Sequence, residues 1–278
     1  MNIDIKKTQS KILEIVKYLD AFCNEYNIKY YLEGGSALGA IRHNGFVPWD
    51  DDFDIIMTYE DYYKFIDICK KHLDKERFYL QKEDTKEWPM FHTKLRMNNT
   101  TYIERDTENR KMHKGVYIDI FCLNNVSDNR ICRYFQYLAS RILISRALYD
   151  RGYNTSSFLK KIVIHTSSVF VRGIVRKKLI NVVRGLNGTD TAFVAHLFGR
   201  DSYNSAIFPS NFFGKPRCVK FSNLVLPVPQ KVENYLEVRF GSDYMKVPDA
   251  KVQEEYQGHA VLVDVDKDYR EFEKEYQV

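Results

Sequence analysis

Four carboxylates fall within five residues, and an apolar run rich in strand formers follows them. They are Asp50, Asp51, Asp52 and Asp54. If the run forms a β-strand, Asp52 and Asp54 stand two residues apart and project from the same face. Two charges about 5 Å apart repel each other by roughly 3 kcal/mol at an effective dielectric of about 20, which raises a pKa or calls for a cation. The spacing therefore predicts a site for a hard divalent ion, Mg²⁺ or Mn²⁺.

A pair of glycines precedes this cluster in the chain. The apolar run Tyr30–Leu32 leads into Gly34, Gly35 and Ser36, and a short helical pattern follows. Glycines at a strand-to-helix junction let a phosphate approach the backbone, and the N–H groups of a helix N-terminus bind anions. Because Mg²⁺ is commonly bound by one or two carboxylates plus substrate phosphates, the combination predicts metal-assisted phosphoryl or nucleotidyl transfer. The alternative is a solvated acidic loop that caps a helix over Tyr59–His72.

Three basic residues are candidates for binding the donor phosphates. Lys94 and Arg96 share one face of a predicted strand, and their charge is opposite to that of the Asp pair. Arg42 lies one residue past the short helix. The alternative for Lys94 and Arg96 is that both are solvent-facing charges.

Composition limits the class of protein. The chain has 278 residues, 44% of them hydrophobic, and a formal net charge of +5, which favours anionic partners without requiring nucleic acid. Five cysteines without a C-x-x-C pair favour free thiols in a reducing compartment. The N-terminus lacks an apolar signal core, so we expect a cytoplasmic protein. Dinucleotide, P-loop, zincin and serine-hydrolase motifs are absent from the sequence.

The elements that must position these residues alternate between helical and extended patterns. Helices are predicted over Ile5–Tyr26 and Glu60–Leu73, and strands over Arg77–Gln81, Phe91–Arg96 and Thr100–Glu104. This alternation predicts an α/β (α+β) fold with a mixed sheet flanked by helices. We expect a catalytic core over residues 1–127, a basic helical segment over 128–187 and a C-terminal part over 188–278.

The segment from Arg130 to Arg184 differs from the rest in charge. It contains twelve Lys or Arg and one acidic residue, Asp150, interleaved with apolar stretches. Two long helices are the predicted structure. Such a surface suits either anionic lipid or an anionic polymer. Binding to lipid would place the protein peripherally at the inner face of the membrane. The alternative is a helical insert whose basic face is solvated.

The stretch GGSALGAIRHNGFVPWDDDFDI resembles the pattern of the LicD family, phosphotransferases related to fukutin-type proteins in the nucleotidyltransferase superfamily. That pattern is roughly G-[TS]-x-L-G-x-x-R followed by P-W-D-x-D-h-D. The matching residues are Gly35, Ser36, Leu38, Gly39, Arg42, Pro48, Trp49, Asp50, Asp52 and Asp54. The later segment FGKPRCVKFSNLVLPVPQKVENYLEVRFGSDYMKVP is similar to the tail that closes LicD proteins.

The resemblance implies a third carboxylate on a later strand, best placed at Asp119 within Gly115-VYIDIFCL, where an unpaired Asp is costly to bury. It implies that Asp52, Asp54 and Asp119 bind the metal, with Asp119 also taking the acceptor proton, and that Gly35 and Ser36 contact phosphates. It also implies transfer of a phospho-alcohol, phosphocholine above all, from a CDP-linked donor such as CDP-choline onto a sugar hydroxyl of teichoic acid, lipopolysaccharide or capsule, with release of CMP. A choline cargo calls for an aromatic box, and Trp49 is the nearest aromatic residue.

Two other classes of function remain open on the sequence. The same metal site serves a nucleotidyltransferase that uses an NTP, and phosphoglycerol, phosphoribitol or phosphoethanolamine are alternative cargoes. A non-catalytic protein that binds an anionic polymer or a membrane through the basic segment is the third interpretation. It predicts that Asp52→Asn leaves function intact, and the complete set of carboxylates argues against it.

Overall fold

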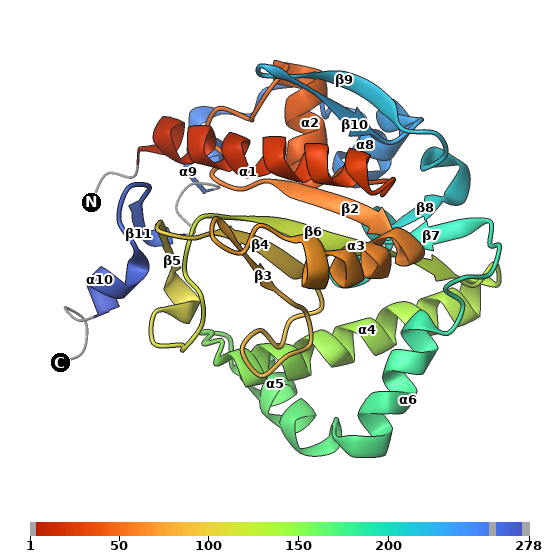
Figure 1. Cartoon of the computed structure of the whole chain (residues 1–278). Coiled ribbons are helices and arrows are strands. Elements are labelled where there is room, and N and C mark those ends of the chain that lie inside the picture. Colours follow the sequence, from red (N-terminus) through yellow and green to blue (C-terminus); the bar gives the residue numbers. More distant parts are fainter. Residues whose placement is uncertain (1–3, 256–259, 274–278) are drawn as a thin grey trace.

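The computed structural model describes residues 4–255 and 260–273, and these ranges contain a seven-stranded mixed sheet (Figure 1). Strands β2 and β6 run parallel to each other, and the other neighbouring strands are antiparallel. The predicted α/β class with a mixed sheet is confirmed. The main path of the sheet is β1 (Tyr31–Leu32), β2 (Asp54–Thr58), β6 (Tyr117–Val126), β4 (Thr93–Met97) and β3 (Phe78–Gln81), and β7 (Phe193–Ala195) and β8 (Ile207–Pro209) extend it beside β6.

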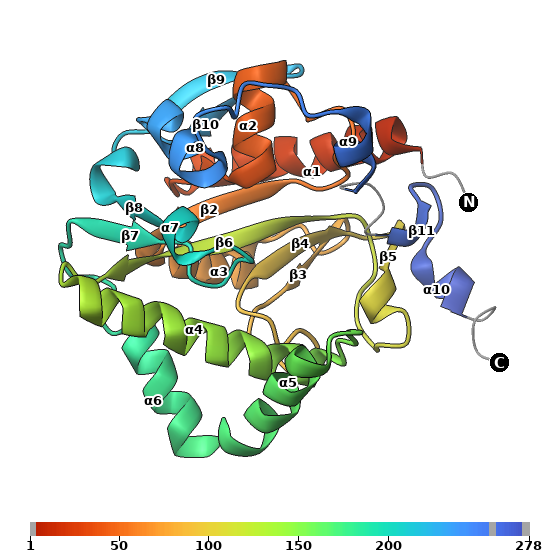
Figure 2. The ribbon, with the colours of Figure 1, turned by 180° about the vertical axis from the view of Figure 1, so that it is seen from behind.

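Two amphipathic helices cover one face of this sheet, in front of it in Figure 1. Helix α1 (Ile5–Glu25) begins at Asp4, whose side chain accepts a hydrogen bond from the backbone of Lys7, and buries the predicted apolar stripe. Helix α3 (Tyr59–His72) begins at Thr58, whose hydroxyl accepts from the backbone of Asp61. Because both helices lie on this face, the site side chains must project from the other face. Figure 2, seen from behind, shows β6 on that side.

The C-terminal part packs beside the glycine-containing helix (Figure 2). Helix α2 (Gly34–His43) lies against the hairpin of β9 (Arg217–Phe221) and β10 (Leu224–Val228) and against α8 (Val232–Phe240). Phe221 places its ring 5.0 Å from that of Phe46 and 5.3 Å from that of Phe53. The two segments that resemble the LicD pattern are therefore adjacent in space. The smaller elements are η1 (Arg105–Thr107), α7 (Tyr203–Ala206), η2 (Ser210–Phe212), α9 (Ala250–Glu255), α10 (Tyr269–Glu273) and the pair β5 (Thr101–Glu104) with β11 (Ala260–Asp264).

The basic segment forms three helices, so the prediction of two long helices is wrong. They are α4 (Arg130–Arg151), α5 (Phe158–Phe170) and α6 (Gly173–Arg184). Gly152 ends α4 with a φ of +83°, and Gly173 has a φ of +48° where the chain turns between α5 and α6. Figures 1 and 2 both show these helices as a triangle below the sheet, with the α5–α6 turn farthest from it.

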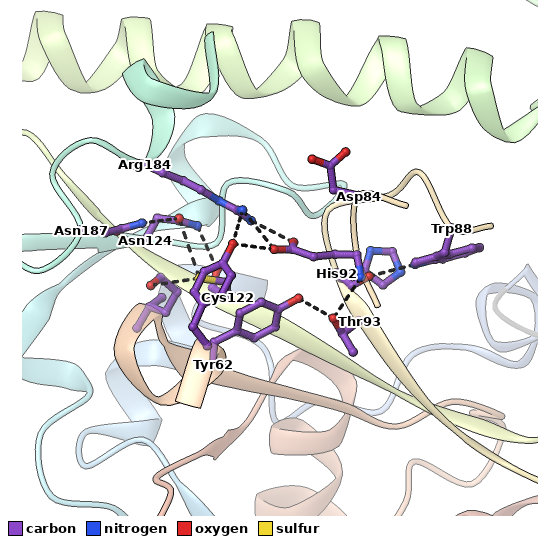
Figure 3. A network of polar contacts seen from close by, with 12 residues as sticks. Tyr62, Asp84, Trp88, His92, Thr93, Cys122, Asn124, Arg184 and Asn187 are labelled. Carbon is purple, nitrogen blue, oxygen red and sulfur yellow. Dashed lines mark hydrogen bonds and ion pairs between the residues drawn. The ribbon is translucent and has the colours of Figure 1, made fainter. Parts of the chain in front are cut away.

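A network of polar contacts attaches α6 to the sheet (Figure 3). Arg184 donates two hydrogen bonds to the buried carboxylate of Glu83, at 3.0 and 2.9 Å, and one to the hydroxyl of Tyr63. Three residues after Arg184, the side chain of Asn187 donates to the side chain of Asn124 at 3.0 Å. The basic segment is thus fixed to the core at its C-terminal end by buried, charge-assisted hydrogen bonds.

Candidate functional site

Two of the predicted carboxylates stand side by side on the central strands. Asp54, the first residue of β2, is the register partner of Asp119 on β6, and the backbone N–H of Asp119 donates to the carbonyl of Phe53 at 2.9 Å. Parallel pairing with matched register puts both side chains on the same face of the sheet. The tertiary structure therefore brings together residues that are 65 positions apart in the sequence.

The first three residues of the acidic cluster lie before β2, and each is held differently. Asp52 precedes β2 instead of lying on it, so the expectation of an Asp pair on one regular strand is corrected. Asp51 is buried and accepts a hydrogen bond from the hydroxyl of Tyr102 at 2.8 Å. The backbone carbonyl of Asp50 accepts from the side chain of Gln9 on α1 at 2.8 Å. Helix α1 thus holds the loop that carries the cluster.

The carboxylates of this cluster repel one another. Burial and the neighbouring charge of Asp52 raise the pKa of Asp50 to about 9. Burial, followed by the charges of Asp52 and Asp119, raises the pKa of Asp54 well above its usual range. Crowded carboxylates with raised pKa values are typical of sites that bind cations.

Helix α2 supports Asp54 directly. The glycines lie in the first turn of this helix, with Glu33 at its N-cap position, and not in a separate turn before it. Ser36 is buried, and its hydroxyl accepts a hydrogen bond from the backbone N–H of Asp54 at 2.8 Å. A Cβ added to Gly34 would lie 3.8 Å from an oxygen of Asp54. Ser36 therefore positions Asp54, and its predicted contact with phosphate, like that of Gly35, stays a prediction.

Asp119 is paired with a buried lysine. The ammonium of Lys94 lies 3.1 and 3.2 Å from the two carboxylate oxygens of Asp119, and the Nε2 atom of His92 lies 3.4 Å from one of them. Burial lowers the pKa of Lys94, although Asp119 and Glu104 oppose this effect. Burial and the charge of Lys94 hold the pKa of His92 well below its usual range, so that this imidazole is neutral at pH 7. Lys94 thus neutralises Asp119, and its predicted contact with phosphate stays a prediction.

Arg96 points into the protein. It is fully buried, and its guanidinium donates to the side chain of Gln81 and to the carbonyl of Gly115, both at 2.8 Å, and lies 3.6 Å from Glu104. Burial opposes the ionisation of Glu104, but Lys94 and Arg96 outweigh it and hold its pKa at about 2. This arrangement does not support the predicted phosphate contact of Arg96, because its donors are directed at groups of the protein.

A second charged cluster adjoins Asp54, and the sequence analysis missed it. The carboxylate of Glu33 is fully buried and lies 2.8 Å from Arg239 of α8, 3.0 Å from Nδ1 of His196 and 3.1 Å from the hydroxyl of Tyr235. The guanidinium of Arg239 also contacts Asp201. No local spacing could have shown this cluster, since Glu33 is separated from these partners by more than 160 residues.

The Glu33 cluster places a positive charge near the site carboxylates. Burial by itself raises the pKa of Glu33, but Arg239 and His196 outweigh it and hold that pKa at about 2. The same Cβ position on Gly34 that lies 3.8 Å from Asp54 lies 3.8 Å from the guanidinium of Arg239. Arg239 therefore stands close to the N-terminus of α2, where the sequence predicted that phosphate binds.

Arg42 and Trp49 lie together at the other end of α2. The guanidinium of Arg42 donates to the backbone carbonyls of Tyr244 and Lys246 at 2.9 and 3.0 Å, and it lies 5.9 Å from the centre of the Trp49 ring. The ring of His43 also contacts Trp49. Arg42 therefore joins α2 to the C-terminal part, and the predicted ligand contacts of Arg42 and Trp49 stay predictions.

The residues present suit a metal ion that takes some of its ligands from the protein and the others from water and a substrate. Within the ranges that the structure describes, no three His, Cys, Asp or Glu side chains are arranged to hold a metal ion by themselves. Asp52 and Asp54 nevertheless supply hard oxygen donors in a crowded, anionic setting, and Mg²⁺ commonly takes only one or two carboxylates and completes its shell with water and phosphate oxygens. Asp119 as a third ligand stays a prediction, since Lys94 is its partner here.

Comparison with known proteins finds a similarity over the part of the chain that contains the site. Residues 27–136 match the LicD family, described as LicD/FKTN/FKRP, nucleotidyltransferase domain. This matched range is about two fifths of the chain, and the similarity is to the family's nucleotidyltransferase domain. The matched range contains Glu33, the start of α2, the acidic cluster, Lys94 and Asp119.

Individual relatives match over short segments. The chain is 44% identical over 66 residues to the lipopolysaccharide cholinephosphotransferase LicD of Haemophilus influenzae, which is 24% of this chain and 25% of that protein. It is 42% identical over 48 residues to the human ribitol 5-phosphate transferase FKRP, which is 17% of this chain and 10% of that protein. An uncharacterised protein of Rickettsia typhi is 38% identical over 63 residues, 23% of this chain and 20% of the relative. The chain thus spans a quarter or less of the curated relatives that it matches.

Proposed function

We propose that this chain is a phosphotransferase that moves a phospho-alcohol from a nucleotide-linked donor onto a sugar hydroxyl of a bacterial cell-surface glycan. Phosphocholine from CDP-choline is the first candidate cargo, and teichoic acid, lipopolysaccharide and capsule are the candidate acceptors. One observation carries the proposal: the range that matches the LicD family holds Asp52, Asp54 and Asp119, and the fold brings the last two into register. The Haemophilus relative is a lipopolysaccharide cholinephosphotransferase, which supports phosphocholine as the cargo.

In the proposed reaction the oxygen of the acceptor hydroxyl attacks the phosphorus that bears the alcohol. The bond from that phosphorus to the CMP oxygen breaks, and CMP leaves with the electron pair. Mg²⁺ held by Asp52 and Asp54 would neutralise the charge that develops on the diphosphate. Asp119 would accept the proton of the acceptor hydroxyl, and Lys94 beside it would stabilise the carboxylate form that accepts.

The surrounding residues hold this arrangement in place. Ser36 fixes the backbone of Asp54, and Gly34, the first residue of α2, stands between Asp54 and Arg239 with its N–H donated to the hydroxyl of Tyr235. The guanidinium of Arg239, which is paired with Glu33 and Asp201, places a pre-organised positive charge beside Asp54 there. Pre-organised donors of this kind contribute most where charge develops in the transition state.

The test is release of CMP from CDP-choline by the purified protein with Mg²⁺, with and without a candidate glycan. We expect Asp52→Asn and Asp54→Asn each to lower the rate by about 100-fold or more. Asp67→Asn on the exposed side of α3 is the matched control and should retain the wild-type rate, because Asp67 is largely exposed and pairs with Lys70 at 2.6 Å, away from the site. Full activity of Asp54→Asn would refute the role given to the carboxylates and favour a non-catalytic binding protein.

A second cargo is favoured by the relative named ribitol 5-phosphate transferase. Turnover of CDP-ribitol or CDP-glycerol, with CDP-choline left intact, would keep the mechanism and replace the cargo. Incorporation of the nucleotide itself from CTP or ATP would instead show a nucleotidyltransferase. Trp49 offers only part of its ring to a quaternary ammonium, because Arg42 and His43 already contact it. Trp49→Ala therefore tests choline selectivity separately from catalysis.

A further inference from the structure

The helices α5 and α6 expose apolar side chains that the packing of the domain does not use. Their inward faces are already buried through Ile164, Val171 and Val183. On the outward side, Phe158 and Leu159 are each 74% exposed, Phe170 is 68% exposed and Ile174 is 73% exposed. The other exposed large apolar residues of these two helices are Ile162, Val163, Val169, Val175 and Val182.

Some of these apolar residues lie at the corner of the helical triangle that points away from the sheet. Figures 1 and 2 show the α5–α6 turn at the lowest corner of the helical triangle, away from the sheet. Phe170 is the last residue of α5 and Ile174 is the second residue of α6, so both lie at this turn. Soluble proteins rarely expose a contiguous apolar patch without a binding partner for it.

The charge of the same helices indicates which partner. Residues 158–184 contain seven Lys or Arg and no Asp or Glu. Arg184 and Arg176 are paired with Glu83 and Asp84, respectively. The five that remain have exposed side chains: Lys160, Lys161, Arg172, Lys177 and Lys178.

We propose that the outer faces of α5 and α6, with the turn between them, form a docking surface for an anionic lipid bilayer. Apolar side chains would enter the boundary between headgroups and acyl chains, and the flanking cations would meet lipid phosphates. The protein would lie on the bilayer, since no helix within the described residues is both long and apolar enough to cross one. A second protein with an acidic surface would satisfy the cations but not the projecting apolar turn.

Helix α4 packs against both α5 and α6, and its C-terminal end reaches the surroundings of Lys94. The C-terminal end of α4 carries Arg151, whose guanidinium lies 5.3 Å from the centre of the Trp88 ring. The ammonium of Lys94 lies 5.0 Å from the same ring. The α5–α6 turn itself lies away from the sheet that carries the site, and the inference does not depend on the proposed reaction.

The experiment is co-sedimentation of the full chain with phosphatidylcholine vesicles that contain or lack phosphatidylglycerol. We expect binding only to the anionic vesicles, and weaker binding at high salt. Lys177→Gln with Lys178→Gln should weaken it about 30-fold, because each cation near the surface contributes about fivefold. Phe170→Ser with Ile174→Ser should weaken it by at least about tenfold through loss of buried apolar area.

A matched control lies at the opposite end of the molecule. Val225 is 64% exposed and pairs with the exposed Lys220 on the β9–β10 hairpin, so Val225→Ser with Lys220→Gln changes the same kinds of residue elsewhere. We expect this control to bind vesicles like the wild type. Each variant is checked for folding by thermal unfolding, and a change in vesicle binding is counted only for variants with the wild-type transition.

Three results would overturn the inference. Absence of binding to anionic vesicles would exclude a lipid surface, and equal loss in the control hairpin would show that only net charge matters. A concentration-dependent dimer that Phe170→Ser with Ile174→Ser converts to monomer would show that a second copy of the chain covers this surface instead. Because sedimentation measures binding and not turnover, failure of the proposed reaction would leave these results unchanged.

Discussion

Replacing Glu33 by Gln tests how much the buried cluster beside Asp54 stabilises the fold. Glu33 accepts from Arg239, His196 and Tyr235 at distances of 2.8 to 3.1 Å, and it is 1% exposed. The glutamine keeps the shape of the side chain but removes its charge, which leaves the Arg239 guanidinium partly unpaired in a buried position. Loss of one partner of a buried ion pair typically costs about 3–5 kcal/mol.

The structure gives a similar magnitude by an independent route. The pKa of Glu33 is lowered from 4.5 to about 2, which corresponds to roughly 3 kcal/mol of charge-dependent stability at about pH 7. Since the pKa in the folded protein is depressed, this stability is present above the unfolded pKa and is lost as the pH falls through the folded pKa. At about pH 3 roughly 1.4 kcal/mol should remain.

The assay is urea unfolding of the wild type and Glu33→Gln at several pH values, with the free energy of unfolding compared at each. The control is Glu233→Gln, since Glu233 is also bonded to an arginine, Arg217, at 2.7 and 3.1 Å, but both side chains are largely exposed. We expect less than about 1 kcal/mol for this control. A loss at Glu33 that stays the same at about pH 3 and about pH 7 would refute the electrostatic explanation and point to shape or hydrogen bonding alone.

Two further predictions concern other charged groups. Arg184→Ala should destabilise the protein by about 3 kcal/mol, because it leaves the carboxylate of Glu83 buried without its cation. Arg176→Ala, at the more exposed pair with Asp84, should cost less than about 1 kcal/mol. Thermal unfolding measures both variants, and equal effects would contradict the role of burial. Asp50→Asn should stabilise the metal-free protein by at most about 4 kcal/mol at about pH 7 and by almost nothing near pH 4. The pKa of Asp50 is raised to about 9 in the folded protein, so the wild type loses stability as the pH rises from the unfolded pKa to the folded pKa. A melting temperature of Asp50→Asn that equals the wild-type value across this pH range would refute the prediction.

Local sequence determined which segments could carry the chemistry. The spacing of apolar residues predicted α1 and α3 to within a residue at either end, and the apolar runs located β3, β4, β5 and β6. The five cysteines are unpaired, as their scattered positions indicated. These features depend on neighbouring residues, because periodicity and capping act over a few positions of the chain.

Local sequence misled where a turn or a helix boundary depends on few residues. The glycine turn before α2 proved to be the first turn of the helix itself, since Glu33 takes the N-cap position and Gly34 tolerates a φ of +51°. The basic segment looked like two helices because its composition is uniform, and only the positive φ angles of Gly152 and Gly173 show where it breaks.

Only the tertiary structure decided which charges neutralise which. Lys94 shares a strand face with Arg96 in the sequence pattern, but the register of β4 against β6 places it on Asp119, and burial turns Arg96 toward Gln81. Glu33 meets its partners only when the last third of the chain packs on α2. The sequence by itself therefore determined the carboxylates and the segments that bear them. Strand register and long-range packing decided the charge partners of these carboxylates and the apolar surface left exposed on α5 and α6, because no local spacing encodes such contacts.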